Sequence, residues 1–153
     1  AAEPGPTVSS PLADGSVVVQ RFPSRNAGLT RVDVHTVTYG LALDHTLEAR
    51  VRRDDGSDVT RHAVWAGVAP DRDWLAIPFA PEAASAGRTY TLELRASGTG
   101  DRNALSFSTS DTAGEPHRLA GAATAETLAL RTFAAWSADV ASASSARVAA
   151  SPA

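Results

Sequence analysis

The stretch GSVVVQRFPSRNAGLTRVDVHTVTYG, residues 15–40, carries the pattern that decides the fold. It holds two runs rich in β-branched and aromatic residues, 17–22 and 29–39, joined by a short polar loop. Pro23 lacks a backbone donor and ends the first run. Polar and apolar residues alternate in the second run, which predicts a strand with one dry and one solvated face. The residues expected on the solvated face are Arg31, Asp33, His35 and Tyr39.

Further runs of the same kind follow along the chain, separated by turn formers. They are residues 46–52, 59–67, 74–79, 89–97, 104–109 and 128–133. Turns are signalled between them, most clearly by the Asp-Gly step in the segment DDGSD, residues 54–58. No amphipathic helix of useful length lies between the strands, which disfavours a parallel α/β arrangement. The sequence therefore predicts an all-β jelly-roll sandwich of about eight antiparallel strands in two sheets.

We expect three segments along the chain. Residues 1–14 are rich in Pro, Gly and Ser, so we expect an extended arm or linker there. Residues 15–136 form the sandwich, and one core is expected for a chain of 153 residues. Residues 137–153 are an Ala/Ser-rich tail with little to bury, which we expect to be disordered.

The composition excludes several classes of partner and chemistry. The net charge is −3, which does not supply the concentrated positive face that nucleic acid requires. The chain has no Cys, so disulfides and thiolate sites are excluded. No apolar run reaches the roughly 18–20 residues that span a bilayer. The first residue is Ala rather than Met, and we expect an extracytoplasmic domain of a bacterial protein.

A set of short motifs resembles the galactose-binding-like jelly-roll domains. Those motifs are Gln20-x-Phe22, Gly28-Leu29, Arg31-Val32-Asp33-Val34, Thr38-Tyr39-Gly40, Phe79-x-Pro81, Ser85-Ala86-Gly87-Arg88-x-Tyr90 and Leu128-x-Leu130-Arg131. The likeness covers residues 15–133 and is strongest to the accessory sandwiches appended to bacterial cell-envelope membrane proteins, including glycosyltransferase-like ones. The resemblance implies a non-catalytic domain that binds carbohydrate, and in some members a structural calcium ion.

Candidate sugar-binding residues combine aromatic faces, which stack on sugar rings, with polar groups that bond hydroxyls. The side chains of these types are His35, Tyr39, Arg50, His62 and Trp65. Residues 62 and 65 lie on opposite faces of one strand, so only one of them can share a surface with the others unless the strand is bulged. The alternative is that Trp65 and Trp74 pack in the core or at a sheet edge. A second alternative is that Arg50 belongs to a charge ladder with Glu48, Arg52, Glu93 and Arg95.

Catalytic and metal-binding patterns are weak by comparison. No G-x-S-x-G nucleophile elbow is present, and Ser85 is expected to bond the backbone of its own loop. The four histidines show no zinc-binding spacing. Turn chemistry explains DDGSD better than a calcium loop does. For a jelly-roll calcium ion the candidate ligands are Asp14 and Asp33.

Three functional hypotheses remain open at this point. The first is a non-catalytic, extracytoplasmic module that binds a glycan. The second is a structural or protein-interaction domain of a larger glycosyltransferase-like membrane protein, docked on a neighbouring envelope domain. The third is a hydrolase whose site is assembled across strands, which would need a histidine and two carboxylates within hydrogen-bond reach of one pocket. An exposed Trp and Tyr cluster rimmed by Arg favours the first, and a broad apolar patch favours the second.

Overall fold

The computed structural model describes residues 4–8, 12–98, 104–110, 117–119, 122–123 and 127–135. The strands in this part are Pro4–Val8 (β1), Val17–Ser24 (β2), Leu29–Val37 (β3), Thr46–Arg53 (β4), Asp58–Trp65 (β5), Asp73–Glu82 (β6), Arg88–Ser97 (β7), Ser106–Ser110 (β8), Arg118–Leu119 (β9), Ala122–Ala123 (β10), Thr127–Leu128 (β11) and Leu130–Ala134 (β12). A single turn of 3₁₀ helix, Ala66–Val68 (η1), follows β5. The predicted tail, residues 137–153, lies outside the described residues.

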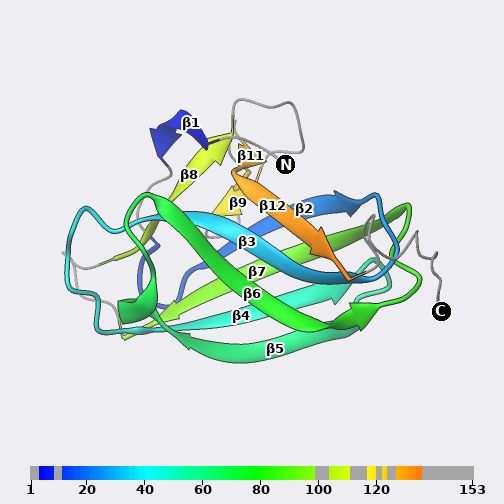
Figure 1. The fold of residues 1–153 in the computed structure, drawn as a ribbon. Helices are drawn as coiled ribbons and strands as arrows, with labels where there is room; N and C mark the ends of the chain where they lie inside the picture. The colour runs from blue at the N-terminus through cyan, green and yellow to red at the C-terminus, as the bar shows by residue number, and fades with distance from the viewer. Residues whose placement is uncertain are drawn as a thin grey trace.

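The strands form two antiparallel sheets that pack face to face (Figure 1). In sheet 1 the order is β1-β8-β3-β6, with β11 and β12 added beside β8 and β3. In sheet 2 the order is β2-β7-β4-β5, with β9 and β10 added beyond β2. Among β1 to β8, the first strand pairs with the last, the second with the seventh, and so inward to β4 with β5. This nested pairing is the jelly-roll arrangement, and it confirms the predicted fold class.

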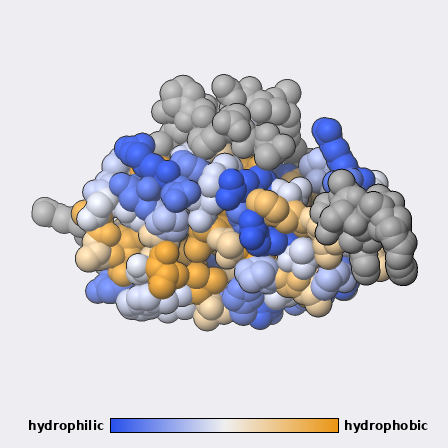
Figure 2. All heavy atoms as spheres, viewed as in Figure 1, coloured by the Kyte–Doolittle hydropathy of each residue, from blue (hydrophilic) through white to orange (hydrophobic). Residues whose placement is uncertain are grey.

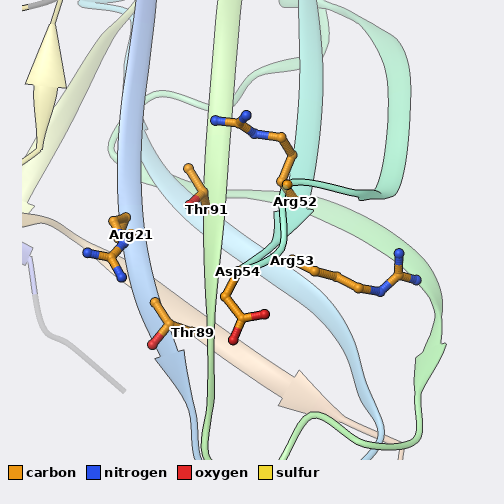
Figure 3. Close-up of a pocket in the computed structure, with 7 residues that line it drawn as sticks. Arg21, Arg52, Arg53, Asp54, Thr89 and Thr91 are labelled. Atoms are coloured by element: carbon orange, nitrogen blue, oxygen red, sulfur yellow. The ribbon is translucent and has the colours of Figure 1, made fainter.

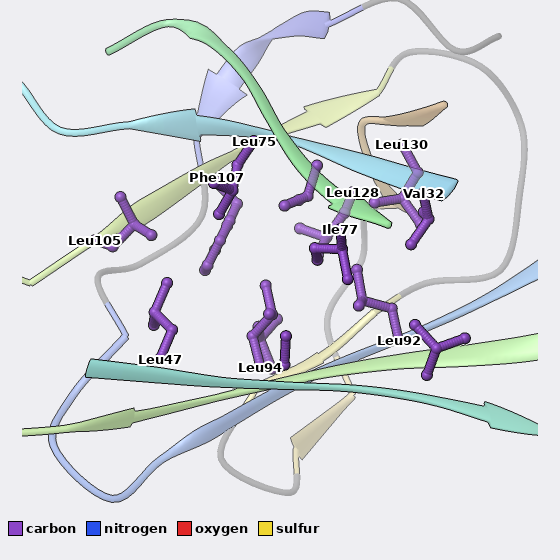
Figure 4. Packing of buried hydrophobic residues seen from close by; sticks show 14 of the residues in the cluster. Val32, Leu47, Leu75, Ile77, Leu92, Leu94, Leu105, Phe107, Leu128 and Leu130 are labelled. Carbon is purple, nitrogen blue, oxygen red and sulfur yellow. The ribbon is translucent and has the colours of Figure 1, made fainter. Parts of the chain in front are cut away.

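The core lies between the two sheets and follows the alternation of the sequence (Figure 4). Sheet 1 contributes side chains such as Val32, Ile77 and Phe107, and sheet 2 contributes Leu47 and Leu94, each with no exposed surface. Burying a side chain of this size stabilises a fold by about 1.5–3 kcal/mol. The inward residues of β4, β6, β7 and β8 are those expected from the period-two pattern.

One polar core residue links the two sheets. The side chain of Gln20 in β2 is 1% exposed, and its Oε1 accepts the backbone N–H of Leu128 in β11 at 2.9 Å. Its Nε2 donates to the carbonyl of Arg21 at 2.7 Å. A buried amide with both ends bonded costs little, whereas an unpaired one would cost about 1–3 kcal/mol.

The N-terminal segment is extended, as expected for an arm, but it joins the sandwich. Residues 4–8 form β1 and pair with β8, and Leu12 has no exposed surface. The packed domain therefore begins before residue 15, where the sequence predicts its start. Proline in β1 is compatible with its position at the sheet edge, because an edge strand has donors that need no partner.

The sequence predicts a solvated face for β3, and this prediction is wrong. Asp33 and His35 are 1% and 8% exposed, and β3 is buried on both faces along most of its length. The pattern of β3 alone predicts a solvated face. However, β12, which lies about 100 residues later in the sequence, pairs with β3, and its Arg131 and Phe133 side chains contact Asp33 and Arg31.

Two local predictions concern turns. The segment DDGSD forms the β4–β5 turn, in which Asp55 Oδ1 accepts the N–H and the hydroxyl of Ser57 at 2.8 and 2.6 Å. This confirms turn chemistry for that segment. The Ser85 side chain does not bond the backbone of its own loop. Its hydroxyl donates to the carbonyl of Asn26 in the β2–β3 loop at 2.6 Å and accepts from the N–H of Leu29 at the start of β3 at 3.0 Å. Within the described residues, no helix has the length and apolar character of a membrane span.

Candidate functional site

One end of the sandwich is made by residues 38–45, between β3 and β4, and residues 66–72, between β5 and β6. We call it the loop end, and Figure 1 shows it at the left, where η1 lies. The N–H of Ala66 donates to the carbonyl of His45 at 2.9 Å, and the N–H of Arg72 donates to a carbonyl of β3 at 2.8 Å. The two segments therefore lie side by side.

Tyr39 at the loop end has a left-handed backbone, with φ of 55°. This region is costly for a bulky side chain, by about 1–3 kcal/mol. Asp71 holds the conformation, because its Oδ1 accepts the N–H groups of Thr38 and Tyr39 at 2.9 and 3.0 Å. The hydrogen bond from the Thr38 N–H, and then that from Tyr39, lowers the pKa of Asp71 against the opposing effect of desolvation. The carboxylate is thus charged wherever the loop is formed at neutral pH.

Arg72 is the only other non-glycine residue with positive φ in the described part of the chain, at 54°. Its guanidinium carbon lies 5.6 Å from the centre of the Tyr39 ring. That distance is within the range of a cation–π contact. Tyr39 and Arg72, two strained residues that are neighbours in the fold, therefore place an aromatic ring and a cation together at the loop end. Backbone strain of this kind clusters at functional sites.

Trp65 is the last residue of β5 and lies opposite Thr46 on the outer face of sheet 2. Its indole passes over Gly67, since a Cβ built there would lie 2.3 Å from Trp65 Nε1 and 2.9 Å from the carbonyl oxygen of Leu43. Only glycine at position 67 leaves room for the indole in this position.

Large apolar side chains at the loop end are unusually exposed. The exposed fractions are 57% for Tyr39, 51% for Trp65, 44% for Leu41 and 66% for Val68. In Figure 2, orange hydrophobic atoms gather toward the left of the view, over the same end of the molecule. Exposed aromatic rings beside a guanidinium and a carboxylate are the groups that bind sugars, because rings stack on C–H faces and charged groups bond hydroxyls.

The structure does not gather the five predicted ligand-binding residues in one place. Tyr39 and Trp65 both lie at the loop end, on adjacent segments. Arg50 lies on the outer face of sheet 2, where its Nε donates to Asp58 Oδ1 at 2.6 Å. His62 pairs with the core residue Ala49 and so faces inward, which confirms that positions 62 and 65 have opposite faces.

His35 is separated from Tyr39, although the alternation predicts them on one face. The regular strand ends at Val37, and the left-handed turn at Tyr39 breaks the alternation. His35 is instead buried on the outer side of β3, where its Nδ1 lies 2.7 Å from Ser108 Oγ and its ring meets Trp74 edge-on at 5.0 Å. Burial is the main cause that lowers the pKa of His35, opposed by Asp73.

A cluster on the outer face of sheet 1 surrounds Asp33. Arg131 Nε donates to its Oδ2 at 2.9 Å, and Arg31 Nη2 donates to the same oxygen at 3.2 Å. Arg31 Nε also lies 2.9 Å from Oδ1, an ion contact without hydrogen-bond geometry. The two guanidinium groups lie over aromatic rings, Arg31 over Phe133 at 3.6 Å and Arg131 over Trp74 at 4.4 Å. This packing attaches β12 to sheet 1.

The outer face of sheet 2 carries the charge ladder that the sequence left as an alternative. Glu93 lies between Arg50, at 3.9 Å, and Arg52, with which it forms a close ion pair. Arg61 and Glu48 form a further pair at 3.4 Å. The side chain of Arg50 is therefore already satisfied by carboxylates and is a weaker candidate for ligand binding than the loop-end aromatics.

The candidate calcium ligands have other partners. Asp33 is neutralised by two arginines, and Asp14 Oδ1 accepts the N–H of Gly98 at 2.6 Å. In the described ranges no group of three or more His, Cys, Asp or Glu side chains could hold a metal ion. The histidines His35 and His62 bond hydroxyl groups, of Ser108 and Thr60, rather than carboxylates.

A family described as "Family of unknown function (DUF6212)" matches residues 2–152. The chain belongs to this family. No curated protein matches the chain. The matched residues include both sheets and the loop end.

The loop-end arrangement could be found only in part from sequence. Tyr39 and Trp65 stand out by residue type, but Asp71 and Arg72, which hold and flank Tyr39, carry no motif. The one local signal is a Pro-Asp-Arg-Asp turn at residues 70–73, which predicts a turn and nothing about its neighbour across the fold.

Proposed function

We propose that this domain is a non-catalytic carbohydrate-binding module of a bacterial cell-envelope protein, located outside the cytoplasm. The observation that carries the proposal is the pair of exposed aromatic rings, Tyr39 and Trp65, on adjacent segments at the loop end. The resemblance to galactose-binding-like sandwiches supports the carbohydrate class and the envelope setting.

The residues at the loop end have complementary roles in this proposal. The Tyr39 ring stacks on the apolar face of a sugar, and its left-handed backbone presents it to solvent. Arg72 and Asp71 supply a donor and an acceptor for sugar hydroxyls beside that ring. Because Asp71 already bonds two backbone groups, the loop is held in place before the ligand arrives, which reduces the entropy cost of binding.

A second function is favoured by two aliphatic residues. Leu41 and Val68 are 44% and 66% exposed at the same end, and such side chains suit a protein contact better than a sugar. In this alternative, the loop end docks on a neighbouring domain of the same envelope protein, and the aromatic rings are part of an apolar interface.

The test is a glycan-array screen of the purified domain, with and without calcium. We expect reproducible binding that weakens in Tyr39→Ala and in Trp65→Ala, with unchanged circular dichroism. The matched control is Phe133→Ala, an aromatic residue that is 38% exposed but lies on the outer face of sheet 1. A blank array in both conditions would reject the glycan proposal for this domain and leave the docking function.

A further inference from the structure

A hollow opens on the outer face of sheet 2, at the end opposite the loop end. It has a volume of about 240 Å³ and is lined by Arg21, Arg52, Arg53, Asp54, Gly56, Thr89 and Thr91. These residues come from β2, β4, β7 and the β4–β5 turn, and Figure 3 shows how they are arranged. The volume is below the roughly 300–1,000 Å³ typical of sites for drug-sized ligands, so the hollow suits one small unit.

Two of the lining arginines are held in place by carboxylates outside the hollow. Arg53 donates Nε and Nη2 to the two oxygens of Glu82 at 2.8 and 2.9 Å, and its Nη1 to Ser57 Oγ at 3.0 Å. Arg52 forms an ion pair with Glu93. In Figure 3 the Arg53 side chain points away from the threonines, whereas Arg52 extends toward Thr91. Arg53 therefore borders the hollow without pointing into it, and Arg52 is the arginine of the two that is positioned to bind a ligand there.

Arg52 retains unused hydrogen-bonding capacity. Its side chain is 32% exposed, so part of the guanidinium is open to solvent. A guanidinium has five N–H donors, and its ion pair with Glu93 leaves most of them for other partners.

The remaining lining groups suit a ligand with both an acid group and hydroxyls. Arg21 is exposed and, with Thr89 and Thr91, lies on outward positions of neighbouring strands β2 and β7. The carboxylate of Asp54, 3.8 Å from Arg88 Nη1, supplies an acceptor at the rim. In and beside the hollow, four guanidinium groups are balanced by four carboxylates, counting Arg21, Arg52, Arg53 and Arg88 against Asp54, Asp55, Glu82 and Glu93. Among the residues that line the hollow itself, three are arginines and one is an aspartate.

We propose that this hollow binds the oxyanion group of a small polyhydroxylated acid, of the class of sugar carboxylates and sugar phosphates. Arg52 and Arg21 donate to the oxyanion, because guanidinium–oxyanion hydrogen bonds are about twice as strong as neutral ones. Thr89, Thr91 and Asp54 bond the ligand hydroxyls. The site is separate from the loop end and does not depend on the function proposed there.

The test is a titration of the isotope-labelled domain followed by amide NMR, at constant ionic strength. The probes are D-glucuronate, glucose 6-phosphate, glucose and inorganic phosphate. We expect one of the two acidic sugars to shift the amide signals of Gly56, Thr89 and Thr91, with glucose at least about tenfold weaker because it lacks the charged group. Glucuronate and glucose 6-phosphate distinguish a carboxylate from a phosphate ester.

Variants separate this site from the rest of the surface. Arg21→Gln and Thr91→Val should weaken binding of the acidic sugar about tenfold or more, since each removes a hydrogen bond to the ligand. The matched control Arg61→Gln changes an arginine whose side chain is 54% exposed on the same sheet face, outside the hollow, and should leave binding unchanged. Tyr39→Ala should also have no effect.

Three results would overturn the proposal. One is the absence of shifts at the hollow with both acidic sugars, and another is equal binding of glucose. The third is inorganic phosphate binding as tightly as glucose 6-phosphate, which would show that the hydroxyl contacts do not exist. None of these results bears on the glycan array, so the two proposals fail independently.

Discussion

Tyr39 has a backbone conformation that glycine would adopt at lower cost. Replacing Tyr39 by Gly should therefore stabilise the domain by up to about 1 kcal/mol, while it removes the ring needed for glycan binding. Tyr39→Ala removes the ring but keeps the strain, so it should lose binding without the gain in stability. Urea unfolding and the glycan array together check this prediction. A Gly variant less stable than the Ala variant would show that the loop is not strained.

Asp71 gives the loop end a pH dependence of its own. Its pKa is lowered in the folded state, so its contribution to stability is complete above the ordinary carboxyl value and is lost as the pH falls through the folded pKa. Because the folded pKa lies below the ordinary carboxyl value, we expect the Tyr39 and Gly40 amide NMR signals to broaden or shift only below about pH 4. Asp71→Asn should show the acid-state signals already at neutral pH. If the spectra of this variant match those of the unmodified domain, Asp71 does not hold the loop.

His45 is 2% exposed, and neither ring nitrogen has a hydrogen-bond partner within the described residues. Desolvation by burial lowers its pKa, against the opposing effects of Asp44 and Asp14. The unfolded chain therefore binds the proton more tightly, and the free energy of unfolding should fall as the pH drops below about 6.5. His45→Leu should reduce this dependence and be neutral or stabilising at pH 7. The pKa of His35 is lowered as well, so the free energy of unfolding of His45→Leu should still depend on pH, but less steeply. A pH dependence as steep as that of the unmodified domain would contradict the prediction.

At the scale of elements, the attachment of β12 depends on Asp33. Asp33→Ala would leave Arg31 and Arg131 facing each other without their shared carboxylate. Loss of one partner from a buried ion pair costs about 3–5 kcal/mol, and we expect about 2 kcal/mol here because both arginines are about one-third exposed. Hydrogen exchange should accelerate in Leu130–Ala134 more than in β4. Uniform acceleration through both sheets would show that β12 unfolds only with the whole domain.

At the scale of the whole molecule, Gln20 links the two sheets through the core. Gln20→Met keeps the volume but leaves the N–H of Leu128 without its partner, and should lower the free energy of unfolding by about 1–3 kcal/mol. The matched control is Leu92→Met on the neighbouring strand, which pairs with Gln20 and should cost less than about 1.5 kcal/mol. Urea unfolding of both variants makes the comparison. Equal losses would mean that packing, not the hydrogen bond, explains the effect.

Much of the fold follows from local pattern. Period-two alternation in β4, β6 and β7 predicts which residues enter the core, because side chains of a strand point alternately to its two faces. Turn residues such as the Asp-Gly step at 55–56 separate the strands as predicted. The candidate site could be predicted only from residue types. These point to Tyr39 and Trp65, but they point equally to Arg50 and His62, which the fold places elsewhere.

The amino-acid sequence by itself determined that this chain forms short antiparallel strands around one apolar core, since alternation and turn chemistry act between residues near in sequence. Only the tertiary structure decided which strands became neighbours. Pairing with β12 buried Asp33 on a face that its own strand marks as wet, and the contact with Asp71 turned Tyr39 out of line with His35. The physical reason is that such contacts join residues far apart in sequence, where the local pattern carries no information about the partner.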